Sequence, residues 1–261
     1  MCGLKNLWNS FKIAFAMFSK IPMPQADWSE ENMRYMLCFF PWVGAVIGVC
    51  IYLWNMLCAA LGIGRTCYVL VAVAIPILVT GGFHVDGFMD TMDALHSYQS
   101  RERKLEILKD SHIGAFAVIM LAAYGLLYGG AFSEIHDTRL LTIVCAGFVL
   151  SRCLSGIGVV TLPSARENGM LYEAASHAQG RIVKGALYAQ GALCIAFMLW
   201  QSGIAGIVIV LAAFGAYGYY VYRSRKEFGG ITGDTAGYFV LICEGAMVIA
   251  AAVLEHVPVS L

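Results

Sequence analysis

The chain has 261 residues and no formal net charge; 59% of its residues are apolar and only 13% are charged. Soluble domains usually carry about 25% charged residues, so this composition excludes an ordinary soluble protein and indicates one built for a lipid bilayer. A neutral chain also gives no reason to expect a nucleic acid as partner.

The first predicted element is an amphipathic helix at the N-terminus. Lys5 and Lys12 lie between apolar residues that recur at helical spacing. Those apolar residues are Leu4, Leu7, Trp8, Phe11, Phe15 and Phe18. Such a helix lies in the membrane interface or packs on the protein's own surface, and the pattern leaves both readings open.

Apolar segments of the length that a bilayer core requires then follow one another along the chain. They cover 37–59, 67–83, 113–132, 140–160, 185–201, 204–222 and 236–254. These segments predict an all-α fold, a polytopic integral membrane helical bundle with about seven transmembrane helices and polar cytoplasmic loops. We expect one domain, 1–261, with kinks at Pro41 and Pro76.

Loop charges predict the orientation of this bundle. If the spans alternate in direction, one set of loops holds fourteen lysines and arginines and the other holds only Arg65 and Arg139. Positive residues accumulate on the cytoplasmic side of membrane proteins. The N-terminus and the long polar loops are therefore expected in the cytoplasm, and the C-terminus outside.

The acidic stretch GGFHVDGFMDTMDAL, 81–95, follows the second predicted span. If it is helical, Asp86, Asp90 and Asp93 fall within about 60° of one face. Three carboxylates on one face repel one another unless a cation lies among them, and hard oxygen ligands suit Mg²⁺ or Mn²⁺. A solvated acidic face is the alternative, and we favour the metal site.

His84 is expected to precede this helix. It could act as a general base, donate a hydrogen bond to substrate or serve only as a helix-entry residue.

A basic cluster lies in the next segment, 101–118. Arg101, Arg103 and Lys109, together with Lys104, suit a phosphate held against a metal, or they only mark the cytoplasmic side. Asp110 and Ser111 lead into the third span, where they could help bind an anion or cap the helix.

A glycine-rich stretch, FGGITGDTAGY at 228–238, precedes the last span. It carries Thr232 and Asp234, and Asp234 could be a further metal ligand. The alternative is a flexible turn with a helix cap. Because this stretch is expected on the same side of the membrane as Asp86, we favour a functional role.

Three charged residues give weaker signals. Arg152 and Glu244 lie inside predicted spans, where charges face a cavity or each other, so they form a structural pair or contact a ligand. Arg166 lies in a cytoplasmic loop and could hold a phosphate or only mark topology.

Taken together, these motifs closely resemble the cobalamin synthase family, adenosylcobinamide-GDP ribazoletransferases of the bacterial cytoplasmic (inner) membrane. The resemblance covers nearly the whole chain, and it depends on the order and spacing of its motifs. They are FSKIPMP at 18–24, FFPWVGAVIG at 39–48, GGFHVDGFMDTMDAL at 81–95, KDSHIGAFAV at 109–118, SR at 151–152, PSARENGM at 163–170 and GGITGDTAG at 229–237. His112 departs from the arginine expected there, which removes a permanent cation.

The resemblance implies a reaction in which a hydroxyl of α-ribazole, or of its 5′-phosphate, attacks adenosylcobinamide-GDP and GMP leaves. His84, Asp86 and Asp90 would be catalytic. Mg²⁺ would be held by Asp86, Asp90, Asp93 and Asp234. Substrate-binding residues would be Arg101, Arg103, Lys109, Asp110, Ser111, Arg152, Arg166 and Thr232. The sequence leaves open which form of α-ribazole is used and whether copies form a homo-oligomer.

Two other functions fit parts of the pattern. A CDP-alcohol phosphotransferase also clusters aspartates around Asp-Gly, but its Asp-Gly-x-x-Ala-Arg pattern is missing after Asp86. A cation-coupled transporter would spread carboxylates through several spans, whereas here they concentrate at one membrane face.

Overall fold

The computed structural model describes residues 3–166, 176, 178 and 180–257. Within these residues the secondary structure is helical, apart from one isolated parallel bridge between Ser164 and Ile231. The predicted all-α class is confirmed.

Helices of spanning length dominate the chain. The long helices are α3 (Phe40–Leu61), α4 (Arg65–Thr80), α5 (Phe83–His96), α7 (Ala115–Ser133), α8 (Thr138–Thr161), α10 (Gly180–Gln201), α11 (Gly203–Arg223) and α12 (Gly233–Glu255). Shorter or peripheral helices are α1 (Leu4–Phe18), α2 (Glu30–Met33), the 3-10 helix η1 (Met36–Phe39), α6 (Arg101–Ile107) and the π-helix η2 (Ser224–Phe228).

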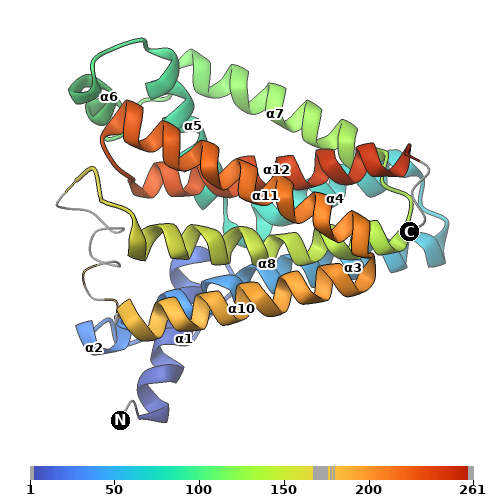
Figure 1. Ribbon diagram of the computed structural model, residues 1–261, viewed down its shortest axis with the longest axis horizontal. Helices are drawn as coiled ribbons and strands as arrows, with labels where there is room; N and C mark the ends of the chain where they lie inside the picture. The colour runs from blue at the N-terminus through green and yellow to red at the C-terminus, as the bar shows by residue number, and fades with distance from the viewer. Residues whose placement is uncertain (1–2, 167–175, 177, 179, 258–261) are drawn as a thin grey trace.

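Six of these helices, α3, α7, α8, α10, α11 and α12, are long and apolar enough to cross a membrane, and they run along the long axis of the molecule (Figure 1). Helices α4 and α5 meet at an angle of 95°, and they make a seventh crossing if this bent pair is one broken span. The expectation of about seven spans is confirmed in this form. The expected segment 67–83, however, does not continue as one helix, since α4 ends at Thr80.

Two consecutive glycines produce this break. Gly81 and Gly82 have φ of 66° and 82°, in the left-handed region that only glycine adopts without strain. The N–H groups of Gly81 and Gly82 both donate to the carbonyl oxygen of Ile77, which closes the last turn of α4. The chain therefore leaves the direction of α4, and α5 begins within the bundle rather than beyond its end.

Connecting loops gather at two opposite ends, as the alternation of spans requires. At one end, Arg65 donates to the carbonyl oxygens of Ser133 (2.6 Å) and Ile135 (2.5 Å), and Glu255 accepts from the N–H of Asp137. At the other end, called the polar end below, the loops around 101–110, 161–166 and 224–234 contact one another. The grouping of loops inferred from charge is thus reproduced.

Helix α8 lies near the centre of the bundle and packs against α3, α10 and α12. Its approach to α3 depends on Gly44 and Gly48, which are spaced like a small-xxx-small motif. A Cβ at Gly44 would lie 2.1 Å from the carbonyl oxygen of Phe148, and one at Gly48 would lie 2.4 Å from that of Cys145.

This contact predicts that Gly44→Ala destabilises the bundle by about 1–3 kcal/mol, because the added methyl must push two backbones apart. Unfolding in a titration with SDS, followed by circular dichroism, measures the change. Gly215→Ala is the matched control, since Gly215 also lies within a helix but has no neighbouring atom within 4 Å of its Cβ position. Equal stability of the two variants would contradict the close packing of α3 on α8.

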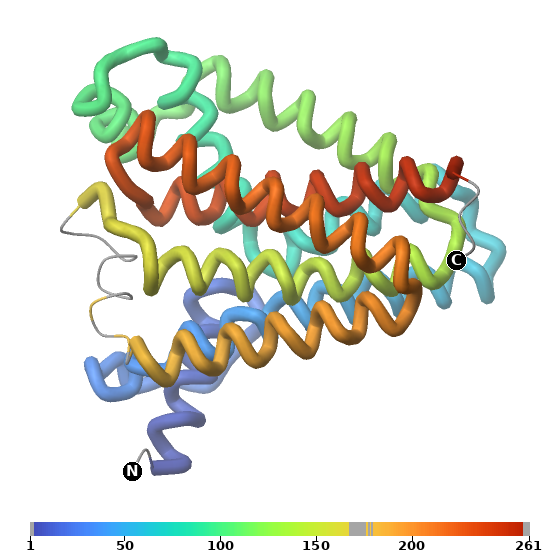
Figure 2. The backbone as a smooth tube through the Cα atoms, in the orientation of Figure 1, coloured from blue at the N-terminus to red at the C-terminus, as the bar shows by residue number. Residues whose placement is uncertain are grey.

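The two halves of helix α1 fit the two alternatives left open by the N-terminal pattern, packing on the protein and lying in the membrane interface. The helix runs crosswise to the long helices near the polar end, and its N-terminal part extends beyond them (Figure 2). Its second half packs on the protein, with Ile13 and Ala14 fully buried. Its first half leaves Leu4 88% and Trp8 55% exposed. This exposed apolar half is the part suited to the membrane interface.

Candidate functional site

The acidic stretch forms helix α5, and its two faces separate as predicted. Phe88, Met92 and Leu95 are buried on the face that packs inward. Asp86 is exposed and Asp90 is partly buried on the other face. The expectation that His84 precedes this helix is wrong, because α5 begins at Phe83 and His84 lies in its first turn.

Helix α5 packs against the first turns of α12, and this contact brings the two Gly-Asp segments together. A Cβ at Gly87 would lie 2.8 Å from the carbonyl oxygen of Asp234. A Cβ at Gly237 would lie 3.3 Å from the Cα of His84. Glycine at both positions lets the backbones approach, so residues far apart in sequence form one site.

Three carboxylates, Asp86, Asp90 and Asp234, form what we call the acidic site. The charges of Asp86, Asp234 and Asp93 all act on Asp90, and Asp86 also acts on Asp234. Such mutual repulsion favours a bound cation or a cationic partner. Within the described residues, no three side chains of metal-ligand type are arranged to hold an ion by themselves.

Asp93 has a different environment from the other aspartates of α5. Its Oδ2 accepts from the N–H of Gly114 (2.5 Å) and its Oδ1 from the N–H of Ala117 (2.9 Å). Gly114 is the N-cap residue of α7. Asp93 therefore supplies, from a neighbouring helix, the acceptor that a capping side chain normally provides.

We predict that Asp93→Ala lowers the stability of the folded protein by about 1–2 kcal/mol, because two N–H groups at the start of α7 lose their acceptor. The thermal unfolding midpoint in detergent measures the loss. Asp93→Asn, which keeps one acceptor oxygen, should fall between the wild type and alanine. The exposed Asp110→Ala serves as control, and an equally small effect at both positions would refute the capping role.

Arg166 lies beside the acidic site. Its Nη1 is 3.8 Å from Oδ2 of Asp234, and its Nη2 donates to the carbonyl oxygen of Leu105 at 2.6 Å. The neighbouring Ala165 donates its N–H to Ile231. These contacts hold a guanidinium next to carboxylates, an arrangement that can bind a phosphate between a cation and an arginine.

Thr232 serves as the N-cap of α12. It forms a capping box with Thr235, in which each side chain accepts from the other residue's N–H. Its hydroxyl lies 3.4 Å from Oδ2 of Asp234, and the residue is buried. The cap orients the first turn of α12, so Thr232 supports Asp234 rather than facing solvent.

The residues of the predicted basic cluster have different environments in the structure. Arg101 lies over the turn at Gly229 and donates to the carbonyl oxygen of Lys226 at 3.5 Å. Arg103 is exposed and paired with Glu106 on its own helix, and Lys109 is exposed. Of the three, Arg101 is therefore the one tied to the chain that leads into the acidic site.

Lys104 and Glu227 form a largely buried ion pair, a pairing that sequence patterns did not indicate. Lys104 Nζ lies 2.5 Å from Glu227 Oε2, and Arg223 Nη1 lies 3.2 Å from Oε1. The pair ties α6 to the π-helix η2. The available signal was the single glutamate inside the basic run RSRKEF, 223–228.

Asp110 and Ser111 do not cap α7, which begins at Ala115 and is capped by Asp93. Both residues are exposed. His112 donates from its ring and its backbone N–H to Asp110, and these hydrogen bonds lower the pKa of the Asp110 carboxyl. Asp110 therefore interacts locally with His112, and the alternative that Asp110 or Ser111 caps α7 is wrong.

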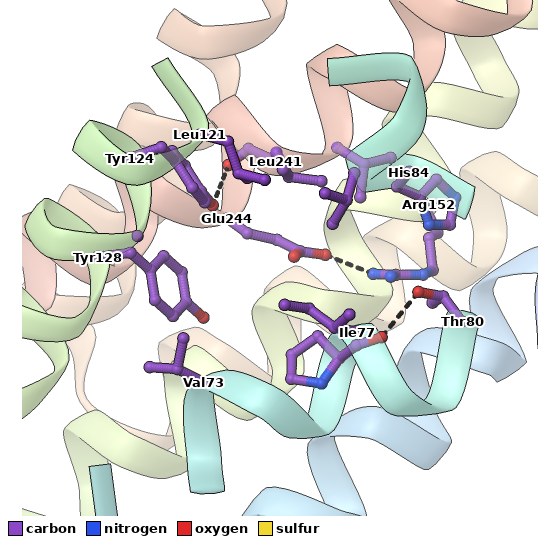
Figure 3. Close-up of a pocket in the computed structure, with 14 residues that line it drawn as sticks. Val73, Ile77, Thr80, His84, Leu121, Tyr124, Tyr128, Arg152, Leu241 and Glu244 are labelled. Carbon is purple, nitrogen blue, oxygen red and sulfur yellow. Dashed lines mark hydrogen bonds and ion pairs between the residues drawn. The ribbon is translucent and has the colours of Figure 1, made fainter. Parts of the chain in front are cut away.

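Arg152 and Glu244 form the buried ion pair that was one of their two predicted roles. Arg152 Nη1 lies 2.6 Å from Glu244 Oε1 (Figure 3). Ser151 donates a further hydrogen bond to the same oxygen. The His84 ring lies beside Arg152 and stacks on Phe40 with centroids 5.6 Å apart. His84 therefore faces this ion pair, on the far side of α5 from the carboxylate of Asp86.

Comparisons with known proteins agree over almost the whole chain. The family described as cobalamin-5-phosphate synthase matches residues 10–252. An adenosylcobinamide-GDP ribazoletransferase of Lachnoclostridium phytofermentans is 41% identical over 259 residues, covering 98% of this chain and 97% of the relative. Enzymes of the same name from Clostridium botulinum and Listeria monocytogenes are 31% and 32% identical, covering 92% and 84% of this chain and 96% and 88% of the relatives. No solved structure matches.

Proposed function

The chain belongs to the cobalamin-5-phosphate synthase family, and from this premise we propose that its acidic site performs the ribazole transfer for which its relatives are named. In this reaction the adenosylcobinamide-phosphate group of adenosylcobinamide-GDP passes to α-ribazole, or to its 5′-phosphate, and GMP leaves. The observation that carries the assignment is the packing of α5 on α12, which joins Asp86 and Asp90 to Asp234.

Mg²⁺ is the proposed cofactor. The donor set fits, because the carboxylates of the acidic site are hard oxygen ligands whose charges act on one another. Mg²⁺ usually binds one or two carboxylates and completes its shell with water and substrate phosphates. This coordination preference agrees with a site in which no three described side chains enclose an ion. Asp93 is left out of the proposed ligands, because both its oxygens accept hydrogen bonds from α7.

Each residue near the acidic site then has a separate task. Asp90, together with either Asp86 or Asp234, would hold the cation, which when bound would neutralise charge on the diphosphate oxygens. Arg166 holds a phosphate oxygen next to Asp234. A carboxylate of the site that is not bound to the cation accepts the proton of the attacking hydroxyl. Positioning and charge neutralisation suffice for such a displacement, which needs no covalent intermediate.

We further propose that the polar end faces the cytoplasm of a bacterial cell and that the chain lies in its inner membrane. The support is the excess of lysines and arginines in the loops of this end. The N-terminus then lies inside. Both substrates are polar, so a site at this end is open to them from the cytoplasm.

One assay tests the activity. Purified protein in detergent is supplied with adenosylcobinamide-GDP, α-ribazole and Mg²⁺, and GMP and the corrinoid product are measured together. Stoichiometric release of GMP with formation of adenosylcobalamin is the expected result. The absence of product with every divalent metal would overturn the assignment. A parallel reaction with a CDP-alcohol and a lipid acceptor should give no CMP, and CMP release would instead favour the CDP-alcohol phosphotransferase alternative.

A further inference from the structure

A small cavity lies at the break between α4 and α5, on the side of α5 away from the acidic site (Figure 3). Its volume is about 80 Å³, and α4, α5, α7, α8 and α12 all contribute to its walls. Aliphatic side chains make up half of the lining residues. Six polar side chains also border it. Thr80 and Tyr124 already donate to the backbone carbonyl oxygens of Pro76 and Leu241. The other four are His84, Tyr128, Arg152 and Glu244.

Several polar atoms around this cavity have no hydrogen-bond partner among the residues that the structure describes. They are both ring nitrogens of His84, the hydroxyl of Tyr128 and Nε of Arg152. These side chains are deeply buried, since His84 is 4%, Tyr128 6% and Arg152 1% exposed. Buried donors and acceptors are normally satisfied, so their convergence on one cavity identifies a binding site.

The chemistry of the cavity selects its ligand. Arg152 is already neutralised by Glu244 at 2.6 Å, so the site favours neither a cation nor an anion. The ligand must both donate and accept hydrogen bonds, because His84 and Tyr128 can do both. One water molecule needs about 10–15 Å³ of such volume, so the cavity has room for several.

We propose that this cavity binds a small cluster of water molecules inside the membrane bundle, and that His84 positions α5 through this cluster. The backbone of His84 packs on Gly237, and its ring stacks on Phe40. Water molecules that bridge the His84 ring, Tyr128 and the Arg152–Glu244 ion pair restrict the rotation of the ring. Asp86 and Asp90 lie on the other face of the same helix, so the position of His84 determines the positions of these two carboxylates. The positioning role of His84, unlike the water cluster, rests on the proposed function.

The water cluster is tested by radiolytic hydroxyl-radical labelling of the protein in detergent, read by mass spectrometry. Radicals form from water, so Tyr128 should be labelled much faster than Tyr220, which is 1% exposed and does not line this cavity. Equal, slow labelling of both tyrosines would overturn the proposal. This experiment requires no substrate, so its outcome is independent of whether the transferase assay succeeds.

A cavity-filling variant provides a second measurement. Gly125 lines the cavity and has no atom within 4 Å of its Cβ position, so Gly125→Leu can be accommodated. It should reduce labelling of Tyr128 to the level of Tyr220. Gly215→Leu, placed on α11 away from the cavity, should leave labelling of Tyr128 unchanged. Unchanged labelling in Gly125→Leu would contradict water bound at this place.

The positioning role is tested by two substitutions of His84. His84→Leu cannot bond to water and should lower kcat about tenfold, the size of effect seen when a supporting contact to a catalytic residue is lost. His84→Gln keeps a donor and an acceptor and should retain most activity. The pH–rate profile should be the same in both variants as in the wild type. Equal inactivation by both changes, together with loss of one limb of the profile, would show proton transfer by His84 instead.

Discussion

Asp90→Asn is expected to abolish ribazole transfer while leaving the protein folded. Asp90 shares the acidic site with Asp86 and Asp234, and both of their charges act on it. Asparagine keeps the shape of the side chain but removes the negative charge that a hard cation requires. Loss of a supporting contact alone lowers metal affinity or activity about 10- to 100-fold, so loss of a ligand should lower kcat by more than about 100-fold.

Measurement of GMP release at saturating Mg²⁺, with the thermal unfolding midpoint of the same preparation, separates chemistry from folding. Relief of repulsion within the acidic site should leave that midpoint unchanged or raise it. Glu31→Gln is the control, because Glu31 is an exposed carboxylate on α2, outside the acidic site. Full activity of Asp90→Asn would show that the metal assignment is wrong.

Arg152→Met is expected to destabilise the bundle by about 3–5 kcal/mol, because it leaves the carboxylate of Glu244 buried without its partner. The two side chains are 1% and 7% exposed, so water cannot replace the lost contact from outside. The double variant Arg152→Met/Glu244→Leu removes both charges. Replacement of a buried pair by apolar side chains is often neutral, so most of the lost stability should return.

An SDS titration of the wild type, both single variants and the double variant gives the coupling energy of the pair. The exposed pair Arg103–Glu106 is a matched control, since its N···O distance is also 2.6 Å but its side chains are 62% and 63% exposed. Arg103→Met should change stability by less than about 1 kcal/mol. A similar loss in Arg103→Met and Arg152→Met would refute the role of burial.

The positions of the spanning helices follow from hydropathy, because a bilayer core demands long apolar segments and little else. The break at Gly81–Gly82 was not predicted, although both glycines were visible. Apolar residues continue up to Phe83, and hydropathy does not register a change of backbone direction. Only the left-handed φ values show that α4 ends there and that α5 begins inside the bundle.

The face of α5 that carries Asp86 and Asp90 was predictable from helical spacing alone. The separate task of Asp93 was not, since it depends on which helix start packs beside it. Likewise, the spacing of His84 and Asp86 predicts that they lie on different faces of a helix. It does not predict that His84 faces the ion pair, because Arg152 and Glu244 lie on α8 and α12. Tertiary contacts decide these roles, and a single sequence does not contain them.

The packing of α5 on α12 also has a consequence for biosynthesis. A membrane protein is inserted as it is translated, so α5 enters the bilayer long before α12 leaves the ribosome. Until then Asp86 and Asp90 lack Asp234, and Arg152 lacks Glu244. Nascent chains arrested before α12 should therefore remain loosely assembled and be sensitive to proteolysis. Helix α12 thus completes both the acidic site and the buried ion pair.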